Sequence, residues 1–284
     1  MTRTWRIRGR TLDLSRRALI MGIVNVTPDS FSDGGLFTDA EVAIAHGLEL
    51  VKQGADLLDV GGESTRPGSS PVSLDEELRR VLPVITGLAA RTDVPLSIDT
   101  SKAEVARQAI AAGAHVVNDV TAGTGDLDMP EIAARSGAGV VLMHMQGMPA
   151  TMQANPTYGD IVAEIADYLK DRVHRFIAAG LTAEHLVIDP GVGFGKTLEH
   201  NIELLTRLSE LLELGRPICL GVSRKGFIGQ IIDRPRGERV IGSVAIACHA
   251  LTRGAAQVLR VHDVAATRDA VRMLAALVYS SRSA

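Results

Sequence analysis

One pattern repeats along nearly the whole chain: a short apolar run, a turn, and then a stretch with apolar residues at helical spacing. Near-continuous apolar runs that alternate with amphipathic helices indicate parallel strands covered by helices. Repetition of this unit predicts an α/β fold, a single (β/α)8 barrel of the TIM type. The apolar runs fall at residues 18–24, 56–60, 95–98, 115–117, 139–143, 185–188, 217–222 and 257–261, and helical spacing is clearest at 74–88, 161–177, 202–214 and 264–278.

An open, doubly wound sheet would give the same pattern within any one unit, so the number of units is the main support for a closed barrel. The chain has 284 residues, which a single barrel can fill. No Pro/Ser linker, charge block or low-complexity stretch divides it. We therefore expect one domain over residues 1–284, opened by a short β-hairpin at about residues 4–15.

Composition narrows the class of protein further. Hydrophobic residues make up 46% of the chain and charged residues 22%, a balance that allows a sizeable core and argues against disorder. Aromatic residues are only 3% and the Lys and Arg residues are scattered, so we expect no nucleic-acid partner. Cys219 and Cys248 predict two free thiols in a reducing compartment. Without an apolar signal-peptide core or a bilayer-length apolar segment, we expect a cytoplasmic location and no membrane partner.

Polar residues follow the end of every expected strand. In a parallel barrel the loops after the strands form one face, and that face holds the active site. Any one of these residues could be a cap or a surface group, but a full set predicts a site at this face. In chain order the set is Asn25; Glu63 and Arg66; Asp99; Asn118 and Asp119; His144; Asp189; Ser223, Arg224 and Lys225; and Arg260, His262 and Asp263.

Two of these loops stand out by composition: residues 25–37, NVTPDSFSDGGLF, and residues 61–68, GGESTRPG. Their Gly and Pro residues are typical of ordinary flexible turns, which is the alternative interpretation. The charged residues Asp29, Asp33 and Arg66 instead favour loops that move over a bound ligand and contact it.

The segment DPGVGFGKT, residues 189–197, nearly matches a phosphate-binding loop, but Pro190 stands where the first Gly belongs. Proline cannot donate a backbone hydrogen bond, so nucleotide hydrolysis through this loop is not expected. We interpret Gly191, Gly193 and Gly195 as positions that let the backbone approach a flat ligand beside Asp189.

The segment GVSRKGFIG, residues 221–229, places Ser223 at the start of a helix, where a carboxylate or phosphate can bind. Arg224 is interpreted as a solvated surface charge, and Lys225 as a residue of the site. His144 and His262 come from distant strands, so we expect no zinc site. No Ser or Cys nucleophile stands in a recognisable catalytic triad. The sequence therefore favours a reaction that needs neither zinc nor an activated nucleophile.

Taken together, these segments resemble the dihydropteroate synthase family, the folate-pathway enzymes. The resemblance spans residues 21–264 and is specific because the motifs occur in the family's order: MGIVNVTPDSFSDGG, DVGGESTRPG, SIDTSK, NDV, VLMHMQG, DPGVGFGKT, GVSRKGFIG and RVHDV. It implies that hydroxymethyl-dihydropterin pyrophosphate condenses with para-aminobenzoate to give dihydropteroate and pyrophosphate. It also implies Mg²⁺ as the cofactor and a homodimer as the assembly.

The resemblance also implies a role for individual residues. Asp99, Asn118, Asp189 and Lys225 would hydrogen-bond the edge of the pterin, Arg260 would stack on its face, and Val120 and Met143 would line the slot. Asn25, Arg260 and His262 would hold the pyrophosphate, with Asn25 as the metal ligand. The para-aminobenzoate site would consist of Thr65, Arg66, Pro67, Phe194 and Ser223.

The implied chemistry is loss of pyrophosphate first, which leaves a methylene cation conjugated with the pterin, followed by attack of the aryl amine. Asp33, Asp99 and Lys225 are the candidate catalytic residues, and the two carboxylates would stabilise the cation. An aryl amine is neutral at pH 7, so no strong base is needed. Two alternatives are a methyltransferase that uses methyltetrahydrofolate and a non-catalytic pterin-binding paralogue. The second is disfavoured because Asn25, Asp33 and Arg66 are all present.

Overall fold

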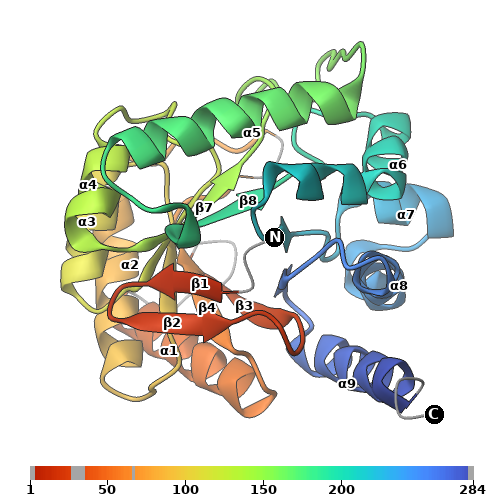
Figure 1. The fold of residues 1–284 in the computed structure, drawn as a ribbon. Helices are drawn as coiled ribbons and strands as arrows, with labels where there is room; N and C mark the ends of the chain where they lie inside the picture. The colour runs from red at the N-terminus through yellow and green to blue at the C-terminus, as the bar shows by residue number, and fades with distance from the viewer. Residues whose placement is uncertain (1–3, 27–35, 66–67, 281–284) are drawn as a thin grey trace.

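A computed structural model of the chain describes residues 4–26, 36–65 and 68–280 (Figure 1). Within these residues eight parallel strands pair in the order β8-β7-β6-β5-β4-β3-β10-β9. An isolated bridge between Ile188 and Ile218 joins the two ends of this order and closes the sheet into a barrel. The predicted (β/α)8 barrel is therefore confirmed. The strands are β3 (Leu19–Asn25), β4 (Leu57–Gly61), β5 (Leu96–Asp99), β6 (Val116–Asp119), β7 (Gly139–Met143), β8 (Leu186–Asp189), β9 (Cys219–Leu220) and β10 (Val258–Val261).

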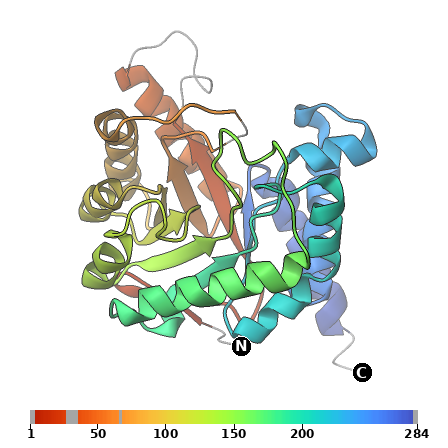
Figure 2. The same ribbon diagram turned by 90° about the horizontal axis from the view of Figure 1, so that it is seen from above.

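Helices surround the barrel, and Figure 2 shows them around its outside. They are α1 (Leu36–Lys52), α2 (Leu74–Ala89), α3 (Ala103–Ala111), α4 (Met129–Ser136), α5 (Ile161–Ala178), α6 (Leu198–Thr206), α7 (Gly226–Ile232), α8 (Val240–Thr252) and α9 (Val264–Ser280), with short 3₁₀ helices η2 (Ala183–His185), η3 (Leu208–Leu214) and η4 (Arg236–Glu238). The helix expected at 202–214 was wrong in its bounds. Thr197 and His200 form a capping box that starts α6 earlier, and the backbone leaves the helical conformation at Arg207.

Alternation of side chains along the strands divides the barrel interior into two layers. The lower layer is apolar and contains Leu19, Met21, Leu57, Val116, Val141, Val187, Cys219 and Val258. Two residues further along the strands, the inward positions are Ile23, Asp59, Asn118, Met143, Asp189, Gly221 and Arg260. Asp99 belongs to the same level, because it pairs in register with Asn118. A polar layer therefore lies one step above an apolar floor.

The N-terminal hairpin closes the lower end of the barrel. Strands β1 (Thr4–Ile7) and β2 (Arg10–Asp13) pair antiparallel, which confirms the predicted hairpin, and they lie across the barrel in Figure 1. The Trp5 side chain is fully buried in the apolar floor, and its Nε1 donates a hydrogen bond to the His185 carbonyl oxygen at 2.9 Å. The polar layer therefore faces the opposite end of the barrel, where the parallel strands end.

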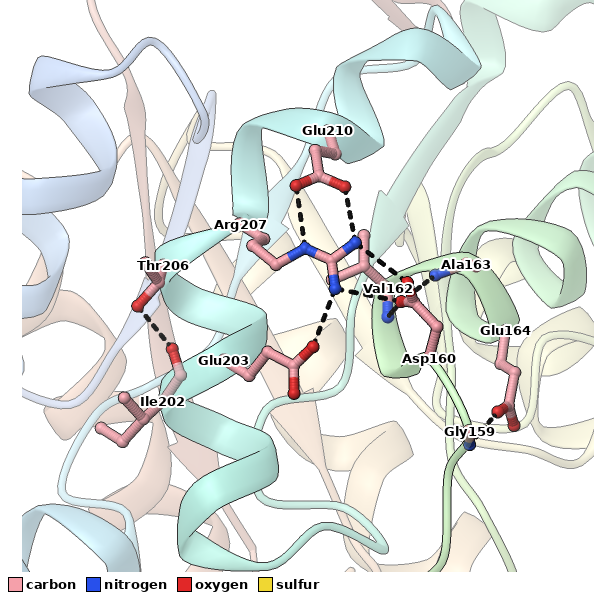
Figure 3. A network of polar contacts seen from close by, with 10 residues as sticks. All are labelled: Gly159, Asp160, Val162, Ala163, Glu164, Ile202, Glu203, Thr206, Arg207 and Glu210. Atoms are coloured by element: carbon pink, nitrogen blue, oxygen red, sulfur yellow. Dashed lines mark hydrogen bonds and ion pairs between the residues drawn. The ribbon is translucent and has the colours of Figure 1, made fainter.

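A polar network ties two helices that flank the site (Figure 3). Asp160 caps α5 by accepting hydrogen bonds from two backbone amides of its first turn. The Arg207 guanidinium, after α6, donates to both oxygens of Asp160 at 3.1 Å and also to Glu203 and Glu210. The network fixes the end of α6 against the start of α5, and α6 in turn follows the loop that carries Gly191–Lys196. Among the described residues, no helix has the length and apolar character needed to span a bilayer.

Candidate active site

Four side chains of the polar layer form a hydrogen-bonded cluster. Arg260 on β10 reaches across the barrel, and its Nε donates to Asp59 Oδ2 on β4 at 2.6 Å. Its Nη2 donates to Asp99 Oδ2 on β5, also at 2.6 Å. Asn118 Nδ2 on β6 donates to Asp59 Oδ2 at 2.9 Å. Four distant segments thus meet as the sequence predicted, except that Asp59 had not been expected among them.

The charges of this cluster are held in a largely dry environment. Asp59 is fully buried, and Asp99 and Asn118 are 8% and 4% exposed. Burial raises the pKa of Asp99, and the ion pair with Arg260 opposes that rise. The cluster therefore places the carboxyl group of Asp99 and a guanidinium held at two of its nitrogens beneath a ligand in the barrel mouth.

Asp189 and Lys225 lie beside this cluster. Asp189 is 5% exposed, and its Oδ1 accepts a hydrogen bond from the Gly191 amide at 2.7 Å. Burial raises the pKa of Asp189, while the Gly191 amide and Lys225 lower it. The half-buried Lys225 has its Nζ 3.9 Å from the centroid of the Phe194 ring. Burial lowers the pKa of Lys225 to about 7, partly offset by Asp189 and Asp99.

A cavity of about 670 Å³ opens above the polar layer, a size suited to a small-molecule ligand. Its lining includes eight of the predicted site residues: Asn25, Thr65, Asp99, Phe194, Ser223, Lys225, Arg260 and His262. A neighbouring cavity of about 510 Å³ shares Thr65 and Asp99 and is also lined by Val120. Asn118, Met143 and Asp189 are buried at inward positions just below. The structure therefore gathers these predicted residues in one region.

Ser223 and His262 contact each other at the cavity wall. Ser223 Oγ accepts a hydrogen bond from the His262 amide at 3.1 Å and lies 3.0 Å from its Nδ1. Burial, together with the nearby Arg260 and Arg224, lowers the pKa of His262 to about 3. The imidazole is therefore neutral at pH 7 and can contact an anion only through a hydrogen bond.

Three predicted site residues lie outside the described part of the chain. Asp33 belongs to residues 27–35, and Arg66 and Pro67 are residues 66–67; the structure describes neither range. Their assigned roles stay predictions.

The glycines of the segment after β8 differ in their surroundings. A Cβ on Gly191 would lie 1.8 Å from the His144 carbonyl oxygen, and one on Gly195 would lie 2.3 Å from the Gln146 carbonyl oxygen. Both have positive φ angles, of 66° and 60°. These two glycines therefore allow the loop to pack on the chain's own backbone after β7, rather than on a ligand. Gly193 does line the cavity.

Replacement of Gly191 by alanine is expected to lower the free energy of unfolding by at least about 2 kcal/mol, because steric overlap adds to left-handed backbone strain. Gly215→Ala is the matched control, since Gly215 has a similar φ of 68° but nothing within 4 Å of an added Cβ. Urea denaturation of both variants measures the difference. Equal losses would show that the backbone approach at His144 is unimportant.

Lys196 is a buried residue of the site region to which the sequence analysis gave no role. Its side chain is 2% exposed, and Nζ lies 3.0 Å from His144 Nδ1 while donating to the carbonyl oxygens of Gly191 and Phe194. This ammonium holds the loop that presents Phe194 and is not available as a phosphate-binding lysine. Burial lowers the pKa of Lys196 to about 7. The sequence gives only a weak signal for this role of Lys196, because the conformation of the loop determines its hydrogen-bond partners.

The interpretation of Arg224 as a solvated surface charge was wrong. Its side chain is 33% exposed, and Nε donates to Asp263 Oδ2 at 2.9 Å. The ion pair joins the segment after β9 to the start of α9, and it arises because both residues follow neighbouring strands of the barrel.

Asp59 was missed because it lies inside an apolar run that was treated only as a strand. A signal was present in the sequence. A charged residue two positions after an inward-facing Leu57 must point into the barrel. Only a residue with a buried polar partner is tolerated there.

Comparison with known proteins agrees with this geometry. Residues 21–262 match the family model described as pterin binding enzyme. The fold and the site thus define the class as pterin-binding enzymes built on a (β/α)8 barrel.

The relatives narrow the class. Dihydropteroate synthase of Escherichia coli K12 is 47% identical over 271 residues, 94% of either chain. The solved structure of the Xanthomonas albilineans enzyme with 4-aminobenzoic acid is 50% identical, with a TM-score of 0.90 over 98% of each chain. The same enzyme in complex with 7,8-dihydropteroate is 48% identical, with a TM-score of 0.86 over 96% of this chain and 98% of that chain. The chain belongs to the dihydropteroate synthase family.

Proposed function

We propose that this chain joins hydroxymethyl-dihydropterin pyrophosphate to para-aminobenzoate, giving dihydropteroate and pyrophosphate for folate biosynthesis. The observation that carries the proposal is the polar layer of the barrel, where acceptors and cations from distant strands surround one cavity. The solved relatives with 4-aminobenzoic acid and 7,8-dihydropteroate support the same substrate and product.

The pterin would bind at the polar layer. A pterin presents donors and acceptors along one edge, and a site made of carboxylates, an amide and an ammonium can recognise that edge selectively. Asp99, Asn118, Asp189 and Lys225 supply these groups, and Val120 and Met143 supply apolar surface. Arg260 would lie over the ring face, because a guanidinium can stack on a ring while its edge reaches phosphate.

The pyrophosphate would lie between Asn25, Arg260 and His262, which share the cavity wall. Mg²⁺ fits this place, since it keeps most of its water, binds substrate phosphates and needs only one or two protein oxygen ligands. The half-buried Asn25 would offer a hard amide oxygen, and it lines the same cavity as Arg260. When bound, Mg²⁺ would neutralise charge on the departing pyrophosphate.

Para-aminobenzoate would occupy the outer part of the cavity. Phe194 gives it a ring surface, and Thr65 and Ser223 line the same space. Ser223 also precedes the start of α7, where backbone N–H groups can bind a carboxylate. Arg66 and Pro67 are proposed to complete this part of the site.

In the reaction, the bond between the pterin methylene carbon and the pyrophosphate oxygen would break first, and its electron pair would leave with pyrophosphate. The cation left on the methylene carbon is shared with the ring, and Asp99 and Asp33 would stabilise it electrostatically. The lone pair of the aryl amine then forms the new carbon–nitrogen bond, and the amine loses one proton. The chain's residues hold both reactants in place and need not act as a strong base.

The test is to incubate the purified protein with both substrates and Mg²⁺, and to measure dihydropteroate and released pyrophosphate in equal amounts. Omission of para-aminobenzoate or addition of a chelator should stop dihydropteroate formation. Binding of the pterin without any turnover would instead support a non-catalytic protein. Light scattering on the same sample tests the proposed homodimer.

A further inference from the structure

Asp59 makes two hydrogen bonds to residues proposed to touch the pterin. Its Oδ2 accepts from Asn118 Nδ2 at 2.9 Å and from Arg260 Nε at 2.6 Å. The residue has no exposed surface. Its second oxygen, Oδ1, is buried and has no hydrogen-bond partner within the described structure. Asp59 thus lies directly beneath the ligand-facing groups without being part of the cavity wall.

The first consequence concerns the orientation of the Asn118 amide. Asp59 Oδ2 acts as the acceptor for both neighbours, so the NH₂ end of the Asn118 amide faces Asp59. The amide oxygen is then held on the other side, where it can accept a hydrogen bond. If the Asn118 amide were flipped, its NH₂ group would face the ligand in place of its oxygen. A ligand that donates a hydrogen bond there would then lose its acceptor.

The second consequence concerns the plane of the Arg260 guanidinium. Asp59 binds Nε while Asp99 binds Nη2, so two carboxylates from neighbouring strands hold one edge of the group. A guanidinium held at two of its nitrogens cannot rotate freely. The face of Arg260 is therefore fixed before a ring stacks on it.

Stability alone gives a poor account of Asp59. A buried ion pair adds little net stability compared with apolar residues of similar volume, and an unpartnered buried oxygen is unfavourable. The neighbouring inward position, Ser97, pairs with Asp59 in register and is also fully buried. It makes no hydrogen bond to Asn118 or Arg260, so it offers a matched control.

We infer that Asp59 is a positioning residue that sets the pterin selectivity of the site, by fixing the orientation of the Asn118 amide and the plane of Arg260. The inference rests on the proposed function and deepens it. It concerns the ring only, so recognition of para-aminobenzoate should not depend on Asp59.

The experiment compares the wild-type protein with Asp59→Asn, Asp59→Ala and Ser97→Ala. Steady-state assays give kcat and both KM values, and calorimetry gives the Kd of 6-hydroxymethylpterin. The Kd of 6-hydroxymethyllumazine, which carries a carbonyl in place of the amino group, measures selectivity. We expect Kd for the pterin to rise about 10-fold in Asp59→Asn and about 100-fold in Asp59→Ala, consistent with loss of one or two charged hydrogen bonds. The preference for pterin over lumazine should fall at least about 5-fold in Asp59→Ala.

The KM for para-aminobenzoate should stay within about twofold, and Ser97→Ala should match the wild type. If the Asp59 variants match Ser97→Ala, or if both KM values rise together with a lower melting temperature, the role is structural and the inference fails. Asp59→Asn keeps the volume of the side chain, so it decides the matter if Asp59→Ala does not fold. A wild-type protein that neither binds the pterin nor forms dihydropteroate would instead overturn the proposed function.

Discussion

Asp189→Ala is expected to weaken binding of the pterin substrate by about 100- to 10,000-fold, the loss of two charged hydrogen bonds, while leaving the fold intact. The buried Asp189 carboxylate is held by the Gly191 amide and faces the polar layer. Its loss would leave donors on the pterin edge without a partner, and each charged hydrogen bond lost corresponds to about 1.5–3 kcal/mol. Calorimetric titration with the pterin measures the effect.

Arg66→Ala is the companion variant, chosen because Arg66 is assigned to the other substrate. It should raise the KM for para-aminobenzoate with little change in the Kd for the pterin. Equal loss of both ligands in each variant would contradict the division of the site into two parts. Circular dichroism and a melting curve show whether either variant has lost its fold.

Lys225 should give the site a pH dependence within an accessible range. Burial lowers its pKa from the ordinary 10.5 to about 7, so the ammonium is present below this pH and loses its proton above it. If the ammonium donates to the pterin, kcat/KM for the pterin substrate should fall as pH rises, with an apparent pKa nearer 7 than 10.5. The kcat/KM profile reports the groups that titrate in the free enzyme.

Two variants test whether the decline of kcat/KM with rising pH comes from Lys225. Lys225→Met should lower kcat/KM by about 10- to 100-fold and remove the decline, because the charged donor is absent at every pH. Lys225→Arg stays protonated, so its kcat/KM should not decline over this pH range either. Its activity should be lower than that of the wild type, because a planar guanidinium does not fit the place of an ammonium. An unchanged decline in either variant would point to Lys196, whose pKa is also lowered to about 7 by burial.

Much of the site could be predicted from the sequence because strand ends are local signals. Asp99, Asn118 and Asp189 each directly follow a predicted apolar run and stand at the last or next-to-last position of the observed strand, and barrel closure brings all such positions to one face. The number of repeated units was enough to predict closure.

The parts of the site that the sequence did not predict depend on contacts between segments far apart in the chain. The role of Asp59 follows from alternation inside a strand and from Arg260, which is 201 residues away. Lys196 depends on a loop that packs on His144, and Arg224 depends on Asp263. Spacing in the sequence does not determine such pairs, because rotamers and loop conformations decide them in the folded chain.

The hairpin that seals the lower end of the barrel also bears on how the reaction avoids water. A methylene cation can also be captured by water, which would give the hydrolysed pterin instead of dihydropteroate. Among the described residues, Trp5 and the apolar side chains around it fill the lower end of the barrel. Hydrolysis therefore has to be prevented on one side only, and a second substrate covering the upper opening is well placed to do so by taking the position that water would otherwise occupy.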